Sequence, residues 1–190
     1  KQWRQDVEAE GFSVIKQSDL DLAAAQLAAG MSHPEAAKLI NGSQKQVAFR
    51  HETKYPFGAK GLIDIIPQGM DDTLVDIKTC EPGALESRRS LQRHMLDWQY
   101  HIQAGSYCQG MSLVSGRDYI VFKFIFVTSK PPFRVAVIDL PFRAISLGAD
   151  QYRAGMARFA DCLERNNWPS IWDGEVELDV PEYAYSDDSP

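Results

Sequence analysis

Two short apolar strands that each contain a carboxylate constrain the fold of this chain more than any other feature. Residues 60–67 and 73–79 are rich in apolar and β-branched side chains, and the five residues between them include Gly and Asp. Such residues favour a tight reversal, so we predict a β-hairpin. The strand period of two then places Asp64 on the same face as Leu62 and Ile66, where a carboxylate is unusual.

The second strand carries Asp76 and Lys78 on the same face as Leu74. Two carboxylates and a lysine should therefore converge on neighbouring strands. Carboxylates placed side by side are costly unless a cation neutralises them, and their oxygens suit Mg²⁺ or Mn²⁺. Such a cation lowers the pKa of a bound water, and a neighbouring ammonium can orient that nucleophile. The pattern predicts phosphodiester hydrolysis, although an Asp-x-Lys triplet alone also fits an ordinary cross-strand charge cluster.

Hydrophobic periodicity predicts one α/β domain in the order helices, three strands, helix, two strands, helix. The expected elements are helices at 18–29 and 32–40, strands at 45–52, 60–67 and 73–79, a helix at 83–112, strands at 119–129 and 133–140, and a helix at 144–165. The long middle helix should bury Leu91, Met95, Trp98 and Ile102 on one face. We expect an N-terminal helical part at 1–43, a core at 44–167 and a tail at 168–190.

Composition excludes some classes of protein. The chain has 190 residues, with 20 Lys and Arg against 26 Asp and Glu and a formal net charge of -6. That balance disfavours a domain that coats nucleic acid electrostatically, but not a metal-dependent enzyme with carboxylates at its centre. The three cysteines form no CxxC pair and are expected to be reduced. No segment resembles a membrane span or a signal peptide, so we expect a cytoplasmic protein without membrane contact.

Three motifs in series point to a family. They are Gly61-x-x-Asp64, Asp76-Ile77-Lys78-Thr79 and Gln103-x-x-x-Tyr107. This series resembles the GxxD, DxK and QxxxY motifs of the RecB-like branch of the PD-(D/E)xK nuclease superfamily. A closer resemblance to RecE-type exonuclease VIII of phage origin covers most of the chain, and includes the stretches at 98–107 and 160–171.

The resemblance implies a PD-(D/E)xK restriction-endonuclease-like core, with a central mixed β-sheet flanked by helices. It also implies a Mg²⁺-dependent exodeoxyribonuclease that digests linear double-stranded DNA processively from its ends, 5′ to 3′, in phage-type recombination. Such enzymes form rings around DNA, for which we expect a trimer or tetramer. They work with a RecT-type single-strand annealing partner.

The same resemblance assigns roles to individual residues. Asp64 and Asp76 would be metal ligands together with the backbone carbonyl of Ile77, and Lys78 would be the catalytic lysine. The helical pair would position the substrate or the site; its members are Gln103 and Tyr107. Two departures matter. Many relatives carry a His on an early helix, for which this chain starts too late. They also carry a Glu on the first strand where this chain offers Gln46, whose neutral amide leaves the number of bound metals open.

Other interpretations stay open. The same core could belong to an endonuclease or a Cas4-like nuclease, although three cysteines are too few for the four-thiolate cluster of the latter. A protein that binds DNA ends without cutting is a further alternative. Arg88, Arg89 and Arg93 could contact DNA phosphates or form a solvated helical face. The four tryptophans are expected in the core or an interface rather than as stacking platforms for bases.

Overall fold

The structure is a computed structural model that describes residues 2–170 and 172–180. Its elements in chain order are α1 (Gln2–Ala9), α2 (Gln17–Ser32), α3 (Pro34–Ile40), β1 (Gln44–His51), β2 (Ala59–Ile66), β3 (Thr73–Cys80), a 3-10 turn η1 (Pro82–Leu85), α4 (Arg88–Asp97), α5 (Tyr100–Ser115), β4 (Val121–Thr128), β5 (Val135–Leu140) and α6 (Phe142–Arg165). The predicted succession of five strands, with helices before them, between the third and fourth, and after the last, is therefore confirmed.

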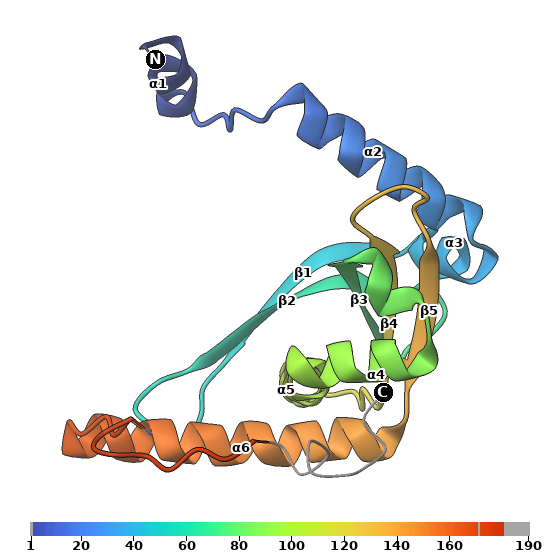
Figure 1. Cartoon of the computed structure of the whole chain (residues 1–190). Coiled ribbons are helices and arrows are strands. Elements are labelled where there is room, and N and C mark those ends of the chain that lie inside the picture. The colour runs from blue at the N-terminus through green and yellow to red at the C-terminus, as the bar shows by residue number, and fades with distance from the viewer. Residues whose placement is uncertain (1, 171, 181–190) are drawn as a thin grey trace. The chain divides into compact units, whose positions relative to one another are not determined.

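The strands form one mixed sheet in the order β1-β2-β3-β4-β5 (Figure 1). The β3–β4 pair is parallel and the other neighbours are antiparallel. A parallel pair needs a crossover, which α4 and α5 supply. The predicted α/β fold with a central mixed sheet flanked by helices is confirmed.

The chain divides into two compact units, Lys1–Ala154 and Gly155–Pro190, and the division falls within α6. The complete sheet and α1 to α5 belong to the first unit. The partition predicted at residues 43 and 167 stays a prediction. Among the described residues, no helix combines the length and the apolar character that a bilayer span requires.

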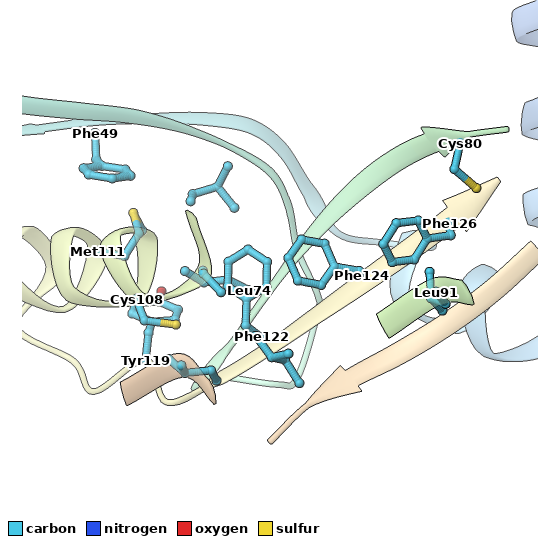
Figure 2. Close-up of a cluster of buried hydrophobic side chains, with 14 residues drawn as sticks. Phe49, Leu74, Cys80, Leu91, Cys108, Met111, Tyr119, Phe122, Phe124 and Phe126 are labelled. Carbon is cyan, nitrogen blue, oxygen red and sulfur yellow. The ribbon is translucent and has the colours of Figure 1, made fainter. Parts of the chain in front are cut away.

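Both faces of the sheet are covered, and β4 shows how. Its even-numbered residues Phe122, Phe124 and Phe126 enter a core that includes side chains of α4 and α5 (Figure 2). Its odd-numbered residues Ile125 and Val127 pack with α3 on the opposite face. A run buried on both faces is typical of a strand inside an α/β sheet.

Strand β3 follows the same alternation and thereby fixes the face of the candidate site. Leu74 packs in the core under α4 and α5, whereas Val75 packs in the cluster beside α3. Asp76 and Lys78 continue the period of two from Leu74. Their side chains therefore extend from the face that α4 and α5 cover.

The prediction of one helix at 83–112 was wrong. The segment folds as η1, α4 and α5, and the break lies at Gln99, whose φ of 52° is left-handed. Glutamine is a good helix former, so the cause is tertiary. The Tyr100 ring packs on Phe124 and Phe126, with ring centroids 5.6 and 5.9 Å apart. Trp98, predicted to be buried, is 66% exposed.

The N-terminal helices also differ from the prediction. Helix α1 was not predicted, and α2 continues to Ser32 beyond Gly30, where the sequence favoured an end. Gly30 is buried, so burial compensates for its low helix propensity. The predicted strands, in contrast, agree with the observed ones to within two residues at each end.

Candidate active site

A buried ion pair lies at the centre of the site. Asp76 is 4% exposed, and its Oδ2 lies 2.6 Å from Nζ of Lys78. Its Oδ1 accepts a 2.7 Å hydrogen bond from Nε2 of Gln103 on α5. Burial raises the pKa of the Asp76 carboxyl above its ordinary value, although the Lys78 ammonium opposes this shift. The predicted contact between the DxK strand and the QxxxY helix therefore exists, through Gln103.

Asp64 joins β2 to β3 beside this pair. The β2–β3 ladder includes the pair Ile65–Val75, and next to it Oδ2 of Asp64 accepts the backbone N–H of Ile77 at 2.9 Å. Since the N–H and C=O of a strand residue point to the same side, the carbonyl of Ile77 also faces β2. The Asp64 carboxylate and the Ile77 carbonyl thus lie where β2 faces β3, and Asp76 is the residue before Ile77 on β3.

Gln46 completes the polar group from β1. Its Nε2 donates a 3.0 Å hydrogen bond to Oδ1 of Asp64. The β1–β2 ladder pairs the neighbouring residues Lys45 and Val47 with Ile65 and Ile63, and Gln46 itself has a left-handed φ of 54°. Such a backbone conformation costs about 1–2 kcal/mol for a residue with a Cβ, and strain of this kind clusters at functional sites. The departure noted in the sequence therefore lies within the site and contacts its carboxylate.

Opposite the region of Gln46, the side chains of β2 do not alternate regularly between the two faces of the sheet. Ile63 and Ile66 both pack with the core under α5, while Ile65 packs on the opposite face. Leu62, which simple alternation placed beside Asp64 and Ile66, is 45% exposed. The expectation of a regular period of two was wrong here, because the strand changes face between residues 63 and 65.

Tyr100 is a site residue that the sequence analysis did not single out. The Lys78 ammonium lies 5.0 Å from the centroid of its ring, which is cation–π distance. Tyr100 precedes Gln103 by three positions and therefore shares its helical face. The spacing of three residues from Gln103 could have identified Tyr100 as a site residue from the sequence. The ring forms an aromatic floor beneath the ammonium and limits the positions that Lys78 can adopt.

Tyr107 has a packing role. Its ring lies edge-on to Phe49 at 5.8 Å and contacts Phe122 at 6.4 Å. The motif glycine Gly61 lies against the same rings, since a Cβ there would be 2.4 Å from Phe49 Cε1 and 3.1 Å from Tyr107 Cε1. Close packing between Gly61 and Tyr107 thus fixes α5 against the β1–β2 hairpin. That contact in turn sets where Gln103 meets Asp76.

Gly61→Ala is expected to destabilise the fold by about 1–3 kcal/mol, because the added methyl group would overlap the Phe49 ring. Urea unfolding measures the change. Gly83→Ala is the matched control, since no atom lies within 4 Å of a Cβ placed there, and it should change stability by less than about 0.5 kcal/mol. Equal effects of the two substitutions would contradict this account of the motif glycine.

The predicted DNA-binding arginines Arg88, Arg89 and Arg93 are all exposed on α4. Arg88 lines a surface cavity of about 580 Å³ together with Arg134 and Glu86. These positions allow contact with phosphates and equally fit a solvated helical face. A DNA-binding role for the three arginines stays a prediction.

The cysteines are free and two of them are buried. Burial raises the pKa of the Cys108 thiol to about 12, and burial together with Glu81 raises the pKa of Cys80. A raised pKa lowers the thiolate fraction at neutral pH, so neither thiol is a good nucleophile.

Iodoacetamide at pH 8 should therefore label Cys162 well before Cys80 and Cys108, and labelling of the buried pair should increase as the pH approaches 12. Timed alkylation of the native protein with peptide mass spectrometry measures this order. Labelling of Cys80 as fast as that of Cys162 would show that Cys80 is a reactive thiol.

The candidate ligands of a divalent cation are the carboxylates of Asp64 and Asp76 and the carbonyl of Ile77. Within residues 2–170 and 172–180, no group of three or more His, Cys, Asp or Glu side chains could hold a metal. Asp76 Oδ2 is buried and receives no well-directed hydrogen bond from any described residue; it meets only the charge of Lys78 at close range. Two carboxylates and one carbonyl fit Mg²⁺, which usually keeps several waters and takes oxygens from its substrate.

Comparison with known proteins bears on the fold and on the family. No curated protein matches the chain. A crystal structure of a "Putative exonuclease" from Eubacterium rectale is similar over 99% of this chain and 73% of that chain, with a TM-score of 0.65 and 15% identity. The crystal structure of SSO0001 covers 90% of this chain and 74% of that chain at 16% identity, but its TM-score of 0.39 is too low to bear on the fold.

The E. rectale protein shares the fold, since an identity of 15% shows no more than that. Residues 7–177 match the family described as the PDDEXK-like domain of unknown function (DUF3799). This match spans most of the chain and includes every residue of the candidate site. The chain therefore belongs to the DUF3799 family of PDDEXK-like domains.

Proposed function

We propose that the protein is a Mg²⁺-dependent exodeoxyribonuclease that hydrolyses linear double-stranded DNA from its ends, with Mn²⁺ as a possible substitute. One observation carries the proposal: Asp64, Asp76 and Lys78 converge from two adjacent strands, and Gln103 holds one oxygen of Asp76. Membership of a PDDEXK-like family supports a nuclease. DNA ends as substrate, 5′ to 3′ polarity and a role in phage-type recombination rest on the resemblance to RecE-type enzymes.

Each residue has a defined task in this proposal. Asp64, Asp76 and the carbonyl of Ile77 would hold the cation, which supplies an activated water and a Lewis acid when it is bound. Gln103 fixes the orientation of Asp76. Lys78, held over the Tyr100 ring, is placed to donate hydrogen bonds to the attacking water or to a phosphate oxygen.

The test compares end-labelled linear duplex DNA with closed circular duplex DNA, in Mg²⁺ and in EDTA. The proposal requires mononucleotide or short products from the linear substrate, none from the circle and none in EDTA. Release of label from 5′ ends before 3′ ends would support the polarity. Cutting of circles would favour the endonuclease alternative on the same core.

A DNA-end-binding protein that does not cut is the second candidate, and Gln46 favours it. Its neutral amide contacts Asp64 where relatives of the RecE type carry a Glu, so the site has one negative charge fewer. Gln46→Glu distinguishes the two candidates. A nuclease should cleave before and after the substitution with a changed dependence on Mg²⁺ concentration, whereas a binding protein should bind DNA ends and show no cleavage with Gln46 present.

The proposal includes assembly into a trimeric or tetrameric ring. An acidic protein holds DNA weakly by surface charge, and a closed ring would keep the duplex threaded while individual contacts break. Cyclic symmetry would also present several copies of Arg88, Arg89 and Arg93 to one channel.

Light scattering should therefore give a trimer or tetramer, and digestion of a long duplex should continue after a competitor DNA trap is added. A monomer whose digestion stops with the trap would exclude the ring and leave the metal chemistry intact. We also propose a RecT-type annealing protein as partner. When it is added, it should coat the single strand that digestion leaves.

A further inference from the structure

A cavity of about 560 Å³ opens next to Lys78, at the carboxyl ends of the parallel strands β3 and β4. The two strand ends are joined there by a 2.7 Å hydrogen bond from the N–H of Ser129 to the carbonyl of Cys80. Ligands of open α/β sheets bind outside the carboxyl ends of parallel strands. The polar and aromatic residues that line the cavity are Lys78, Thr79, Glu81, His94, Trp98, Tyr100 and Ser129.

The break between α4 and α5 orients two aromatic rings into this cavity. In a continuous helix, residues two positions apart would point in nearly opposite directions. The left-handed backbone of Gln99 removes that constraint, and Trp98 and Tyr100 both line the cavity. Trp98 is 66% exposed, so part of its ring is open to a ligand.

The cavity also contains polar groups without partners. Nε2 of His94 and Oγ of Ser129 are buried, and neither has a hydrogen-bond partner among the described residues. The His94 ring is enclosed by Trp98 at 6.3 Å and Tyr100 at 5.8 Å. Unsatisfied buried groups in a native protein call for a specific explanation, and a ligand that supplies the missing partners is one.

The charges at the cavity favour a neutral ligand over a phosphate. Among the described residues that line it there is no arginine, and the one lysine, Lys78, is already paired with Asp76. Glu81 adds a carboxylate that is 71% exposed in its side chain, 3.3 Å from Lys130. A terminal phosphate would meet that carboxylate, whereas a flat, neutral heterocycle would meet aromatic faces and hydrogen-bonding groups.

We infer that this cavity binds the base of the nucleotide next to the phosphate that lies at Lys78. The base stacks on Trp98, and its edge bonds to His94 and Ser129. This inference rests on the proposed function, because Lys78 belongs both to the proposed active site and to the cavity lining. A phosphate at Lys78 therefore places the adjacent base at the cavity. It assigns Trp98 a role in holding the substrate strand, to which the GxxD, DxK and QxxxY motifs give no residue.

A binding experiment without cleavage tests the cavity directly. Tryptophan fluorescence is followed in EDTA and low salt while a short single-stranded oligodeoxynucleotide is added, and then an oligomer of the same length whose residues are all abasic. The oligodeoxynucleotide should quench the emission and the abasic oligomer should not. Trp98→Phe should abolish this quenching. Trp172→Phe is the matched control, because Trp172 is 64% exposed and lies outside the cavity, and it should retain the quenching.

A single-turnover cleavage assay tests the same base in the reaction. An abasic site next to the scissile phosphate should slow the parent protein by roughly 5-fold to 150-fold, the range that one base stacked on an aromatic ring contributes. Trp98→Ala should be slowed by a similar factor on intact DNA and should be insensitive to the abasic site. Trp98 is exposed, so the substitution leaves the core unchanged.

The outcomes separate this inference from the proposed function. Quenching that Trp98→Phe leaves unchanged, or equal sensitivity of parent and Trp98→Ala to the abasic site, overturns the base-binding cavity even if cleavage is normal. Quenching that depends on Trp98 in a protein that cuts no DNA supports the cavity and overturns the nuclease proposal.

Discussion

Asp76→Asn should abolish cleavage of linear duplex DNA while the fold stays intact. The substitution keeps the shape of the side chain and its contact with Gln103, but it removes the charge that a cation needs at the buried Oδ2. Mg²⁺ should raise the melting temperature of the parent protein, because a ligand that binds the folded state stabilises it, and this increase should be absent in the variant. DNA affinity should stay equal or increase as repulsion between carboxylate and phosphate falls.

Asp139→Asn is the control for this experiment. Asp139 also lies on a strand of the sheet and pairs with a lysine, Lys123, but its side chain is 66% exposed and it belongs to β5. The Asp139→Asn variant should cleave DNA at the parental rate. If Asp76→Asn degraded linear duplex as fast as the parent with the same Mg²⁺ dependence, the metal-site assignment would be wrong.

Lys78→Ala should reduce single-turnover cleavage by about 10² to 10³, or ~2.7 to 4 kcal/mol of barrier, which is the usual loss for one positioned electrostatic group. Affinity for DNA should change far less, because one ammonium that is paired with Asp76 contributes little to phosphate binding. The measurements are single-turnover rates at saturating protein and binding curves in EDTA.

Lys123→Ala is a closely matched control. The Lys123 side chain is 22% exposed, against 20% for Lys78, and it also pairs with a carboxylate, that of Asp139 at 2.5 Å. It lies on β4 between Phe122 and Phe124, so it faces away from the α4–α5 side of the sheet. A rate for Lys78→Ala within a few-fold of that for Lys123→Ala would refute the catalytic role of Lys78.

The strands and their carboxylates were predictable because their signals are local. Runs of apolar and β-branched residues around Asp64 and Asp76 gave the bounds of both strands nearly to the residue, although not the face of Leu62, and the DxK spacing placed Lys78 beside Asp76. The contact of Gln103 with Asp76 followed from a motif rather than from periodicity. Local sequence patterns are enough to predict a strand residue's side of the sheet where its neighbours in sequence determine that side.

Local sequence patterns did not predict the helix break at Gln99 or the left-handed backbone of Gln46 within β1. Neither position carries the Gly, Asn or Pro that signals an irregular backbone. Packing of Tyr100 across the sheet determines one, and the Asp64 carboxylate contacts the other. The exposure of Trp98 depends on the first of these, so a single tertiary contact caused both errors about that helix.

The parallel pairing of β3 with β4 has a consequence for the order in which the molecule acquires activity. Lys78 lies opposite Phe126 in that ladder, and the whole crossover of α4 and α5 lies between them in sequence. Contacts across such a long loop form late, since closure entropy must be overcome first. A nascent chain that has already exposed both carboxylates still lacks the aromatic floor and the amide that hold Lys78 and Asp76. Under the proposed function, hydrolysis therefore requires that the crossover of α4 and α5 has closed.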